Sequence, residues 1–508
     1  MKKFLFPILL LAVLSSLTAQ ETTLPAELPQ PITLQNILPV DGKGYVKVKS
    51  DDFEAPTSVI LEYYNYDNQL LAEKRIPTER QQEYFAVENI FVWNSSVVFL
   101  ASLYTPVRKN NRLLLYQYDL PTLAEKQPKV LLTTKAPPDV RIRFLNKLSP
   151  DKSKLAVATW SFTDMKKEGQ IGLHLFDVDF QEISSKTIEL LYKNERLFQE
   201  SLLVGDDGNI FYIGNHYKGN LNAEFYGSQM EKFVLAYFST TKKQVVLPLE
   251  LDKLRFDQTT FLLNTQQQLV GFSLVKKGLS DRFQGLVIST LNPNSQQFDL
   301  KEIGITKDDF KEAFTAYNPE VKASKIGFTN FFINQATALK DGYLLLAERV
   351  RESTFIAVED AEITTSMLYE DILTIKVNTE GQVQWMNRIP KRQVMLADSP
   401  YASFKALRRY ESLLFFYNDN YANLTESVGR RTENATLEKA ELVFNIMDLK
   451  TGQFQPRKLQ NLMGKDYRTL PKYIHVVSPN ELFFYGQKRA NKEEIVKKLK
   501  LLPKEQKN

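Results

Sequence analysis

The sequence has no cysteine, only three histidines and a nearly even balance of charge. The absence of cysteine excludes disulfide bonds, thiol catalysis, zinc fingers and iron–sulfur clusters. Three histidines, His174, His216 and His475, leave little material for a histidine-rich metal site. With 65 Lys+Arg against 60 Asp+Glu, the net charge of +5 is too small to indicate a nucleic-acid partner, which requires a concentrated basic face. We therefore expect no metal, no cofactor and no nucleic acid.

Long apolar runs are missing beyond the first 20 residues, where no segment reaches the roughly 18 apolar residues of a membrane span. Residues 1–20 place Lys2 and Lys3 before an apolar stretch, and small and polar residues then lead to Ala19. This order is typical of a secretory signal peptide, so we expect cleavage after Ala19 and no membrane span in the mature chain. A retained N-terminal anchor is the alternative. Because no cysteine follows the stretch, a lipoprotein anchor is excluded, and the expected location is the periplasm or the cell surface.

What the sequence does contain is a repeat of β-type runs. Each unit has one apolar run, a loop, and a second run broken by a tight polar turn, as in VVFLASLY (97–104) followed by RLLLYQYDLPTLAEK (112–126). Eight such units recur at intervals of about 53 to 74 residues, with β-branched and aromatic residues at alternate positions. Turns such as NTEG and DLKTG carry Gly381 and Gly452, which suit a left-handed turn position.

This repeat predicts an all-β fold, a β-propeller of eight blades with four antiparallel strands each; seven blades are the alternative count. A β-sandwich array or two separate β domains is the alternative fold. We expect one propeller domain over residues 31–502, after a short linker at 20–30 and before a tail at 503–508. The run PITLQNILP (31–39) is expected to close the ring by adding the fourth strand to the last blade.

Two segments resemble known propeller repeats. SPDKSKLAVATW (149–160) resembles the Ser-Pro-Asp-Gly…Ile-Ala-Phe repeat of bacterial periplasmic propellers such as the Tol-system protein, with Lys152 in place of the usual glycine. DILTIKVNTEGQVQW (371–385) is similar to a secreted propeller repeat in which Asp-Ile-Trp-Val-Val-Lys precedes a glycine and a tryptophan; Leu373 replaces the first tryptophan. Each resemblance covers one blade, so it implies the fold and leaves the function open.

The repeat also predicts which face of the propeller carries long connections. If strands a to d run from the axis to the rim, the a–b and c–d turns lie on one face and the b–c and d–a connections on the other. The c–d turns are tight, whereas the b–c connections 217–231, 351–370 and 419–440 are long. Residues 303–330 form a long d–a connection, with a helix expected near 307–316. Because long loops in compact domains often carry function, we expect a partner-binding surface on this loop-rich face.

Aromatic and basic residues stand where the second strand of a unit reaches this face. Such side chains are enriched as anchors of protein interfaces, although they could also stack on a glycan or hold an anionic group. Loop 351–370 carries five acidic residues against Arg351, so the face is expected to be mixed in charge, which favours a protein partner. The candidate binding residues are Tyr104, Trp160, His216, Tyr217, Arg349, Arg351, Lys488 and Arg489.

Motifs of catalysis and metal binding are weak. Asp206-Asp207-Gly208-Asn209 lacks the acidic spacing of a calcium loop and is interpreted as a hairpin turn. The sequence contains no Gly-x-Ser-x-Gly elbow, P-loop or His-Glu-x-x-His segment. His174 and His475 lie within apolar strand patterns, which favours buried structural roles, and His216 alone ends a strand near the loop-rich face. We identify no catalytic residue.

Together these features favour an exported, non-enzymatic binding or scaffold protein whose partner is a protein. One alternative is a secreted carbohydrate-active enzyme with its site at the propeller mouth, which requires paired carboxylates that converge there. The other is an accessory subunit of an outer-membrane assembly, recruited through 303–330 and 351–370.

Overall fold

The fold was examined in a computed structural model of the chain. It describes residues 33–500 except for positions 41, 52–55, 79–82, 136–143, 162–166, 194–196, 218–229, 250–253, 278–282, 306–329, 357–362, 397–398, 400, 421–439, 458–466, 479 and 489–493. The described residues form eight antiparallel sheets and almost no helix.

The first four sheets each use consecutive strands of the chain. Blade 1 contains β1 (Thr33–Val40), β2 (Gly44–Ser50), β3 (Ser58–Asn65) and β4 (Leu70–Pro77). Blade 2 contains β5 (Tyr84–Trp93), β6 (Ser96–Thr105), β7 (Asn110–Asp119), β8 (Ala124–Glu125) and β9 (Lys129–Lys135). Blade 3 contains β10 (Leu145–Leu148), β11 (Leu155–Ser161), β12 (Glu168–Phe176) and β13 (Glu182–Lys193). Blade 4 contains β14 (Leu197–Val204), β15 (Ile210–Tyr217), β16 (Met230–Phe238) and β17 (Lys243–Pro248).

The remaining strands form blades 5 to 8. Blade 5 contains β18 (Leu254–Leu263), β19 (Leu269–Lys277), β20 (Phe283–Asn292) and β21 (Gln297–Ile303). Blade 6 contains β22 (Phe331–Leu339), β23 (Gly342–Ile356), β24 (Ile363–Asn378), β25 (Val383–Ile389) and β26 (Gln393–Leu396). Blade 7 contains β27 (Phe404–Arg409), β28 (Ser412–Asn420), β29 (Ala440–Asp448) and β30 (Phe454–Arg457). Blade 8 contains β31 (Tyr467–Thr469), the 3₁₀-helix η4 (Pro471–Tyr473), β32 (His475–Ser478), β33 (Glu481–Lys488) and β34 (Glu494–Lys500). Blades 5 and 7 also use consecutive strands, whereas β26 of blade 6 pairs with β24 and the strands of blade 8 are ordered β31-β33-β32, with β34 on the other side of β33.

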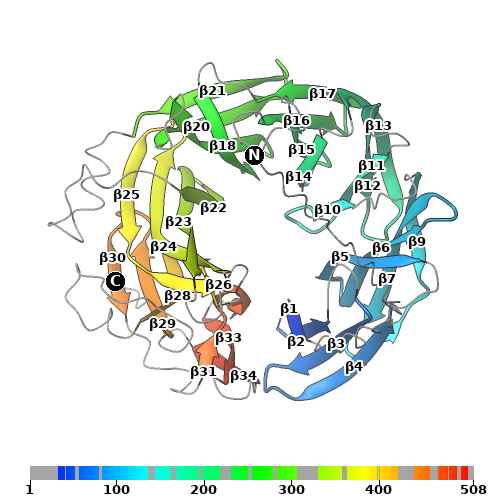
Figure 1. The fold of residues 1–508 in the computed structure, drawn as a ribbon, viewed down its shortest axis with the longest axis horizontal. Coiled ribbons are helices and arrows are strands. Elements are labelled where there is room, and N and C mark those ends of the chain that lie inside the picture. Colours follow the sequence, from blue (N-terminus) through cyan, green and yellow to red (C-terminus); the bar gives the residue numbers. More distant parts are fainter. Residues whose placement is uncertain are drawn as a thin grey trace, which may run out of the picture.

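The eight sheets stand around a ring (Figure 1). In blade 6, for example, β22 lies nearer the centre of the ring and β25 lies at its rim. The all-β propeller of eight blades is therefore confirmed. The runs assigned from the sequence to strand b and to the c–d hairpin are the second, third and fourth strands of blades 1 to 7, for example β6, β7 and β8, and in blade 8 they are β33 and β34.

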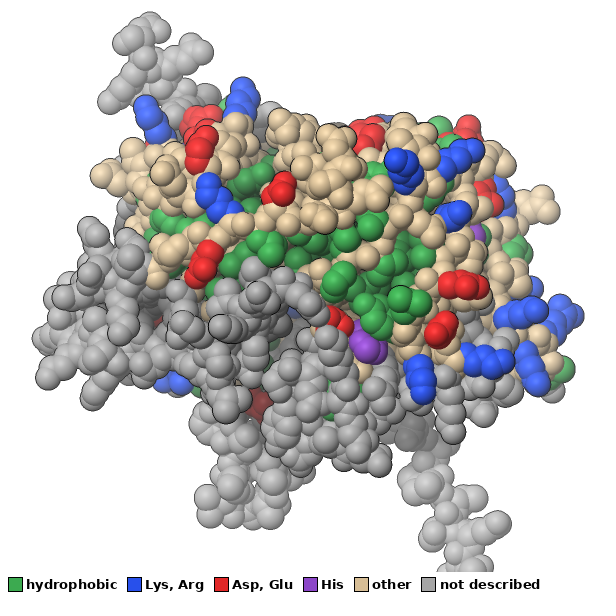
Figure 2. Space-filling model, turned by 90° about the horizontal axis from the view of Figure 1, so that it is seen from above, with side chains coloured by type: hydrophobic (Ala, Val, Ile, Leu, Met, Phe, Trp, Pro, Cys, Tyr) green, Lys and Arg blue, Asp and Glu red, His purple; other side chains and the backbone are tan. Residues whose placement is uncertain are grey.

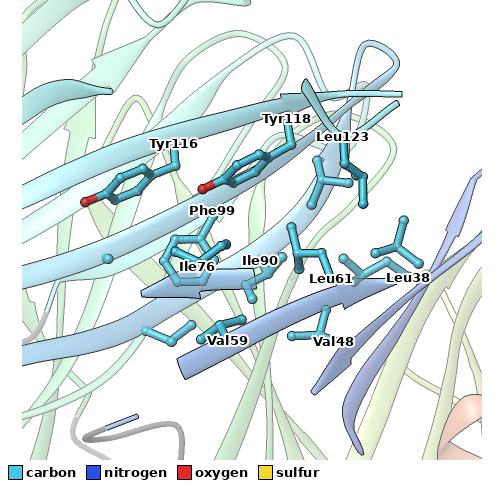
Figure 3. Packing of buried hydrophobic residues seen from close by; sticks show 14 of the residues in the cluster. Leu38, Val48, Val59, Leu61, Ile76, Ile90, Phe99, Tyr116, Tyr118 and Leu123 are labelled. Carbon is cyan, nitrogen blue, oxygen red and sulfur yellow. The ribbon is translucent and has the colours of Figure 1, made fainter. Parts of the chain in front are cut away.

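Hydrophobic residues fill the spaces between neighbouring blades. The described part of the chain contains eight clusters of buried residues, and each one joins one blade to the next. Between blades 1 and 2, Val48 and Leu61 face Phe99 and Tyr118 (Figure 3). Because both faces of a blade are covered, strands such as β6 are buried along their whole length, which explains their continuous apolar sequences. The aromatic residues of the repeat thus pack between blades.

The face that carries the a–b and c–d turns is tied together by hydrogen bonds between turns. In blades 3, 4 and 5, the Asp151 amide donates to Asp206 Oδ1 (3.0 Å), and the Asp206 amide donates to Gln267 Oε1 (2.9 Å). Asp206-Asp207-Gly208-Asn209 forms the hairpin turn predicted for it, closed by Gly205 N–H to the Asn209 carbonyl at 2.9 Å. Lys152 adopts φ +57°, the left-handed conformation that glycine would take in the repeat it resembles.

The ring does not close as the sequence suggests: the prediction that residues 31–39 complete the last blade is wrong. β1 pairs with β2, from Thr33 opposite Ser50 to Val40 opposite Gly44, and is therefore the inner strand of blade 1. Only a short turn separates these two strands, so the hairpin forms at a small entropic cost compared with pairing across the whole chain. In blade 8, β31 and β32 together form the inner strand beside β33, and β34 lies on the other side of β33.

Side chains close the seam between blades 8 and 1 instead of an exchanged strand. The apolar part of this seam contains Ile37, Tyr45, Leu470, Phe483 and Tyr485. The Tyr473 hydroxyl of blade 8 donates to the Gln35 carbonyl of blade 1 at 3.0 Å. Lys47 forms a buried ion pair with Glu494, and its Nζ lies 4.5 Å from the centre of the Tyr64 ring. Burial raises the pKa of Glu494, but the bonds from Lys47 and Tyr485 outweigh this effect and lower it.

The segment 351–370 is also different from its prediction as a loop. β23 continues to Ile356 and β24 begins at Ile363, and the two strands pair from Val350 opposite Tyr369 to Ile356 opposite Ile363. The inner neighbour β22 reaches only to Arg349, so seven residues of β23 extend beyond it, which corresponds to about 20 Å of strand.

Charged side chains of both signs are interspersed along the rim, and hydrophobic side chains form a band between them (Figure 2). Within the described residues, no helix is long and apolar enough to cross a membrane.

Candidate binding face

A repeated β-bulge shapes the loop-rich end of the inner strands. In blades 1, 2, 4, 5 and 6, the pairing of the inner strand with strand b shifts by one residue at the same level, as between Leu34 and Asn36 or between Gln199 and Ser201. A β-bulge changes the direction in which the side chain of the extra residue points. The bulged Gln35, Glu200 and Asn334 each bond to a strand of their own blade, through Ser50, Asn215 and Glu348 respectively. The bulges therefore place polar groups next to the ends of strand b.

Of the aromatic residues predicted to bind a partner, the structure buries two. Tyr104 is 4% exposed and Tyr217 is 1% exposed, so neither presents its ring to a partner. Trp160 is half-buried and packs against the cluster between blades 3 and 4. The sequence pattern predicted the ends of strand b correctly, but strand alternation turns these side chains toward the neighbouring blade.

His216 is held by neighbours in blades 3 and 4. Its ring stacks on Tyr192 with centroids 4.2 Å apart, and its Nδ1 lies 3.8 Å from Glu231 Oε2. His174 bonds to Glu182 through Nδ1 at 2.8 Å and keeps 20% of its side chain exposed, so it is less buried than expected.

Two of the predicted binding residues and three of the predicted connections lie at the edges of the described segments or outside them. Lys488 ends β33 and is half-buried, whereas Arg489 lies outside the described residues. The same is true of most of the connections 217–231, 303–330 and 419–440, including the helix expected at 307–316. Asp419 and Asn420, at the start of the last connection, belong to β28 and are buried.

A buried ion pair lies at the loop-rich end of blade 6. Glu348 on β23 and Lys391, just before β26, are 1% and 0% exposed in their side chains and contact each other directly. Glu348 Oε2 also accepts hydrogen bonds from Asn334 Nδ2 (2.9 Å) and from the Ser403 hydroxyl. Lys391 Nζ donates to Gln393 Oε1 at 2.8 Å. The pair is therefore embedded in a polar network, as a buried charge requires.

This network continues into the next two blades. Gln393 Nε2 donates to the Asn418 carbonyl of blade 7 (2.7 Å), and Asn418 Nδ2 donates to the Thr469 carbonyl of blade 8 (3.0 Å). The Tyr401 hydroxyl donates to Gln487 Oε1 of blade 8 at 2.7 Å. Hydrogen bonds thus fix the loop-rich ends of blades 6, 7 and 8 relative to one another.

A second charged cluster occupies the opposite face of the same strands. Between Glu348 and Val350 the pairing shifts, so that Arg349 stands opposite both Glu370 and Asp371. Arg351 binds Glu370 with two parallel hydrogen bonds, Nε to Oε2 at 2.9 Å and Nη2 to Oε1 at 2.6 Å. Arg349 Nε is 3.5 Å from Glu370 Oε2, and Arg388 Nη2 is 2.6 Å from Asp371 Oδ2.

Burial lowers the pKa of Arg349, Glu370 opposes this effect, and Arg351 adds to it. Of the residues predicted to bind, Arg349 and Arg351 are brought together by a shared partner, Glu370. From the sequence, Glu370 was predicted only as one of the acidic residues of the loop 351–370. Glu348 and Lys391 gave no signal in the sequence, because their pairing depends on a turn after β25 that returns the chain to β24.

The arrangement is suited to recognition by charge and hydrogen bonding. Among the described residues, no group of three or more His, Asp or Glu side chains is placed to hold a metal ion.

No family model and no curated protein matches this sequence. Solved structures that resemble the fold include a variant of the Synechocystis apocarotenoid oxygenase, at 9% identity and a TM-score of 0.37, with 92% of each chain covered. The β-propeller domain of the trilobed protease from Pyrococcus furiosus shares 9% identity at a TM-score of 0.35, covering 84% of this chain and 97% of that domain. Hydrazine synthase from Kuenenia stuttgartiensis shares 13% identity at a TM-score of 0.27, covering 53% of this chain and 79% of that one. At these scores, the likenesses carry no argument about activity.

Proposed function

We propose that the protein is an exported, non-enzymatic binding protein that engages a protein partner through its loop-rich face. The order of lysines, apolar stretch and small residues in 1–20 supports export to the periplasm or cell surface. The observation that carries the binding role is the β23–β24 hairpin, which extends beyond the inner strand of its blade on this face.

The two faces of the propeller support this choice of surface. The opposite face consists of short turns whose hydrogen-bonding groups already bind one another, as in Asp151, Asp206 and Gln267. On the loop-rich face, a network of buried hydrogen bonds holds blades 6 to 8, and the charged hairpin extends from this base. A rigid base lowers the entropy lost on binding, so such a surface suits a specific partner.

Photo-crosslinking tests the proposed face. We expect p-benzoylphenylalanine at Glu352, an exposed position on β23, to give an ultraviolet-dependent adduct with one protein in intact envelopes. The matched control is the same residue at Tyr410, which is 57% exposed in the a–b turn of blade 7 on the opposite face, and which should give no adduct. Adducts from Tyr410 alone, or from neither position, would contradict the proposal.

A further inference from the structure

We propose that the arginine cluster of blade 6 is an anion-binding site that takes the carboxylates of an acidic segment of the partner protein. This inference rests on the proposed function and specifies the chemistry of the partner. The cluster consists of Arg349, Arg351, Arg388, Arg392, Glu370 and Asp371.

Strand alternation places Arg392 on the same face as Glu370. Lys391 and Gln393 are buried and bond to each other, whereas Arg392 between them is half-buried, so its side chain points to the opposite face. β26 pairs with β24 up to Tyr369 opposite Gln393, and the next positions along the two strands are Glu370 and Arg392. The Tyr369 ring lies 5.6 Å from Lys391 Nζ, which assigns Tyr369 to the Lys391 face and Glu370 to the other.

The charges of the cluster do not balance. Three guanidinium groups contact the two carboxylates, and the register adds Arg392 on the same face, so these four arginines and two acids carry a net charge of +2. Lys391 does not add to this charge, because Glu348 neutralises it on the other face. The next acidic residue along β23 is Glu352, which directly follows Arg351 and is exposed.

Two of the four arginines retain donors for a ligand. Arg392 has no hydrogen bond or ion pair in the described part of the chain, and its Nε is buried without an acceptor. Within the described ranges, Arg349 Nε likewise has no hydrogen bond, and its ion-pair contact is the 3.5 Å approach to Glu370 Oε2. A half-buried guanidinium without an acceptor loses hydration and gains nothing in return, so an anion that binds it recovers this free energy.

A carboxylate fits these donors because an arginine of the same cluster, Arg351, already binds the carboxylate of Glu370. Arg351 holds Glu370 through two parallel hydrogen bonds, which is the fork geometry of arginine with a carboxylate. Arg349 lies beside that carboxylate, and the strand register places Arg392 next to Glu370 on the same face. An acidic segment with two neighbouring carboxylates would balance the +2 charge.

Fluorescence anisotropy of a labelled hexaglutamate peptide with the full chain tests the site, at about 50 mM salt to limit screening. We expect saturable binding that Arg392→Gln weakens about tenfold, the effect of losing a charge-assisted hydrogen bond. Arg392→Gln breaks no hydrogen bond or ion pair among the residues that the structure describes, so the fold should remain intact. The matched control is Arg75→Gln, an exposed arginine on β4 of blade 1, which should leave the dissociation constant unchanged.

Three outcomes would overturn the proposal: no saturable binding of hexaglutamate, equal effects of the two substitutions, or displacement of the peptide by inorganic phosphate at far lower concentration than by free glutamate. The last outcome would assign the site to phosphate. If the site fails while Glu352 still crosslinks a partner, the proposed function stands and the carboxylate chemistry is wrong. If hexaglutamate binds as expected while Glu352 gives no adduct, the anion site stands and the proposed function fails.

Discussion

Replacement of Lys391 by methionine is expected to destabilise the protein by about 3 to 5 kcal/mol, because it leaves the Glu348 carboxylate buried without a counter-charge. Asn334 and Ser403 still donate hydrogen bonds to Glu348, but neutral donors compensate only part of the cost of a buried charge. The shift in the guanidinium midpoint of unfolding, with the slope of the transition, measures this loss.

Two further variants separate the ion pair from the general effect of a substitution. The double variant Lys391→Met with Glu348→Gln removes the uncompensated charge and should recover more than half of the lost stability. Lys450→Met, in the exposed c–d turn of blade 7, should change stability by no more than about 0.5 kcal/mol. A loss of less than about 1 kcal/mol for Lys391→Met would show that this pair does not support the loop-rich end of blade 6.

Acidification is expected to weaken the seam between blades 8 and 1 through His475. Burial lowers the pKa of His475 to about 4, and the nearby Lys405 of blade 7 lowers it as well, while a hydrogen bond with the Ile37 backbone opposes them. In the unfolded chain the imidazole titrates near 6.5, so the unfolded state binds more protons between these two values. Stability therefore falls as the pH drops from about 6.5 to about 4, by about 2 kcal/mol between pH 7 and pH 5.

Unfolding by denaturant at pH 7 and pH 5 measures this dependence, and His475→Gln should remove most of it. The matched control is His174→Gln, which removes a histidine of blade 3 that lies outside the seam between blades 8 and 1. The pKa of Glu494 is lowered, so the stability contributed by the Lys47 pair is lost only below the ordinary carboxylate pKa of about 4.3. A wild-type protein that is equally stable at pH 5 and pH 7 would contradict the burial of a neutral His475 in the seam.

The repeat made most of the fold predictable. Apolar runs such as those of β6 and β7 reflect burial between two blades, and this pattern is local to the sequence. Ring closure was not predictable in this way, because the pairing of β1 with β2 and its packing on Tyr485 depend on contacts between the two ends of the chain. Pattern alone could not distinguish a strand that completes the last blade from a strand that completes the first.

The candidate site was predictable only in part. Arg349 and Arg351 were found because they follow an apolar strand that ends on the loop-rich face. The sequence did not predict that the site has a buried ion pair on one face of the strands and an arginine cluster on the other. This arrangement depends on the shift in pairing at Arg349 and on the return of β26 to β24. Tyr104 and Tyr217 show the opposite error: they stand at the correct ends of their strands, but their rings pack inside the fold.

The central claim is that the loop-rich face binds a partner while the face of short turns does not. Amide hydrogen exchange of the full chain, free and bound to the partner captured through Glu352, tests this claim most directly. Exchange should slow on partner binding within 348–356, 363–371 and 391–396, where β23, β24 and β26 form the candidate site. Slower exchange in the turns 149–154, 205–209 and 264–268, with none in the blade 6 segments, would contradict the account.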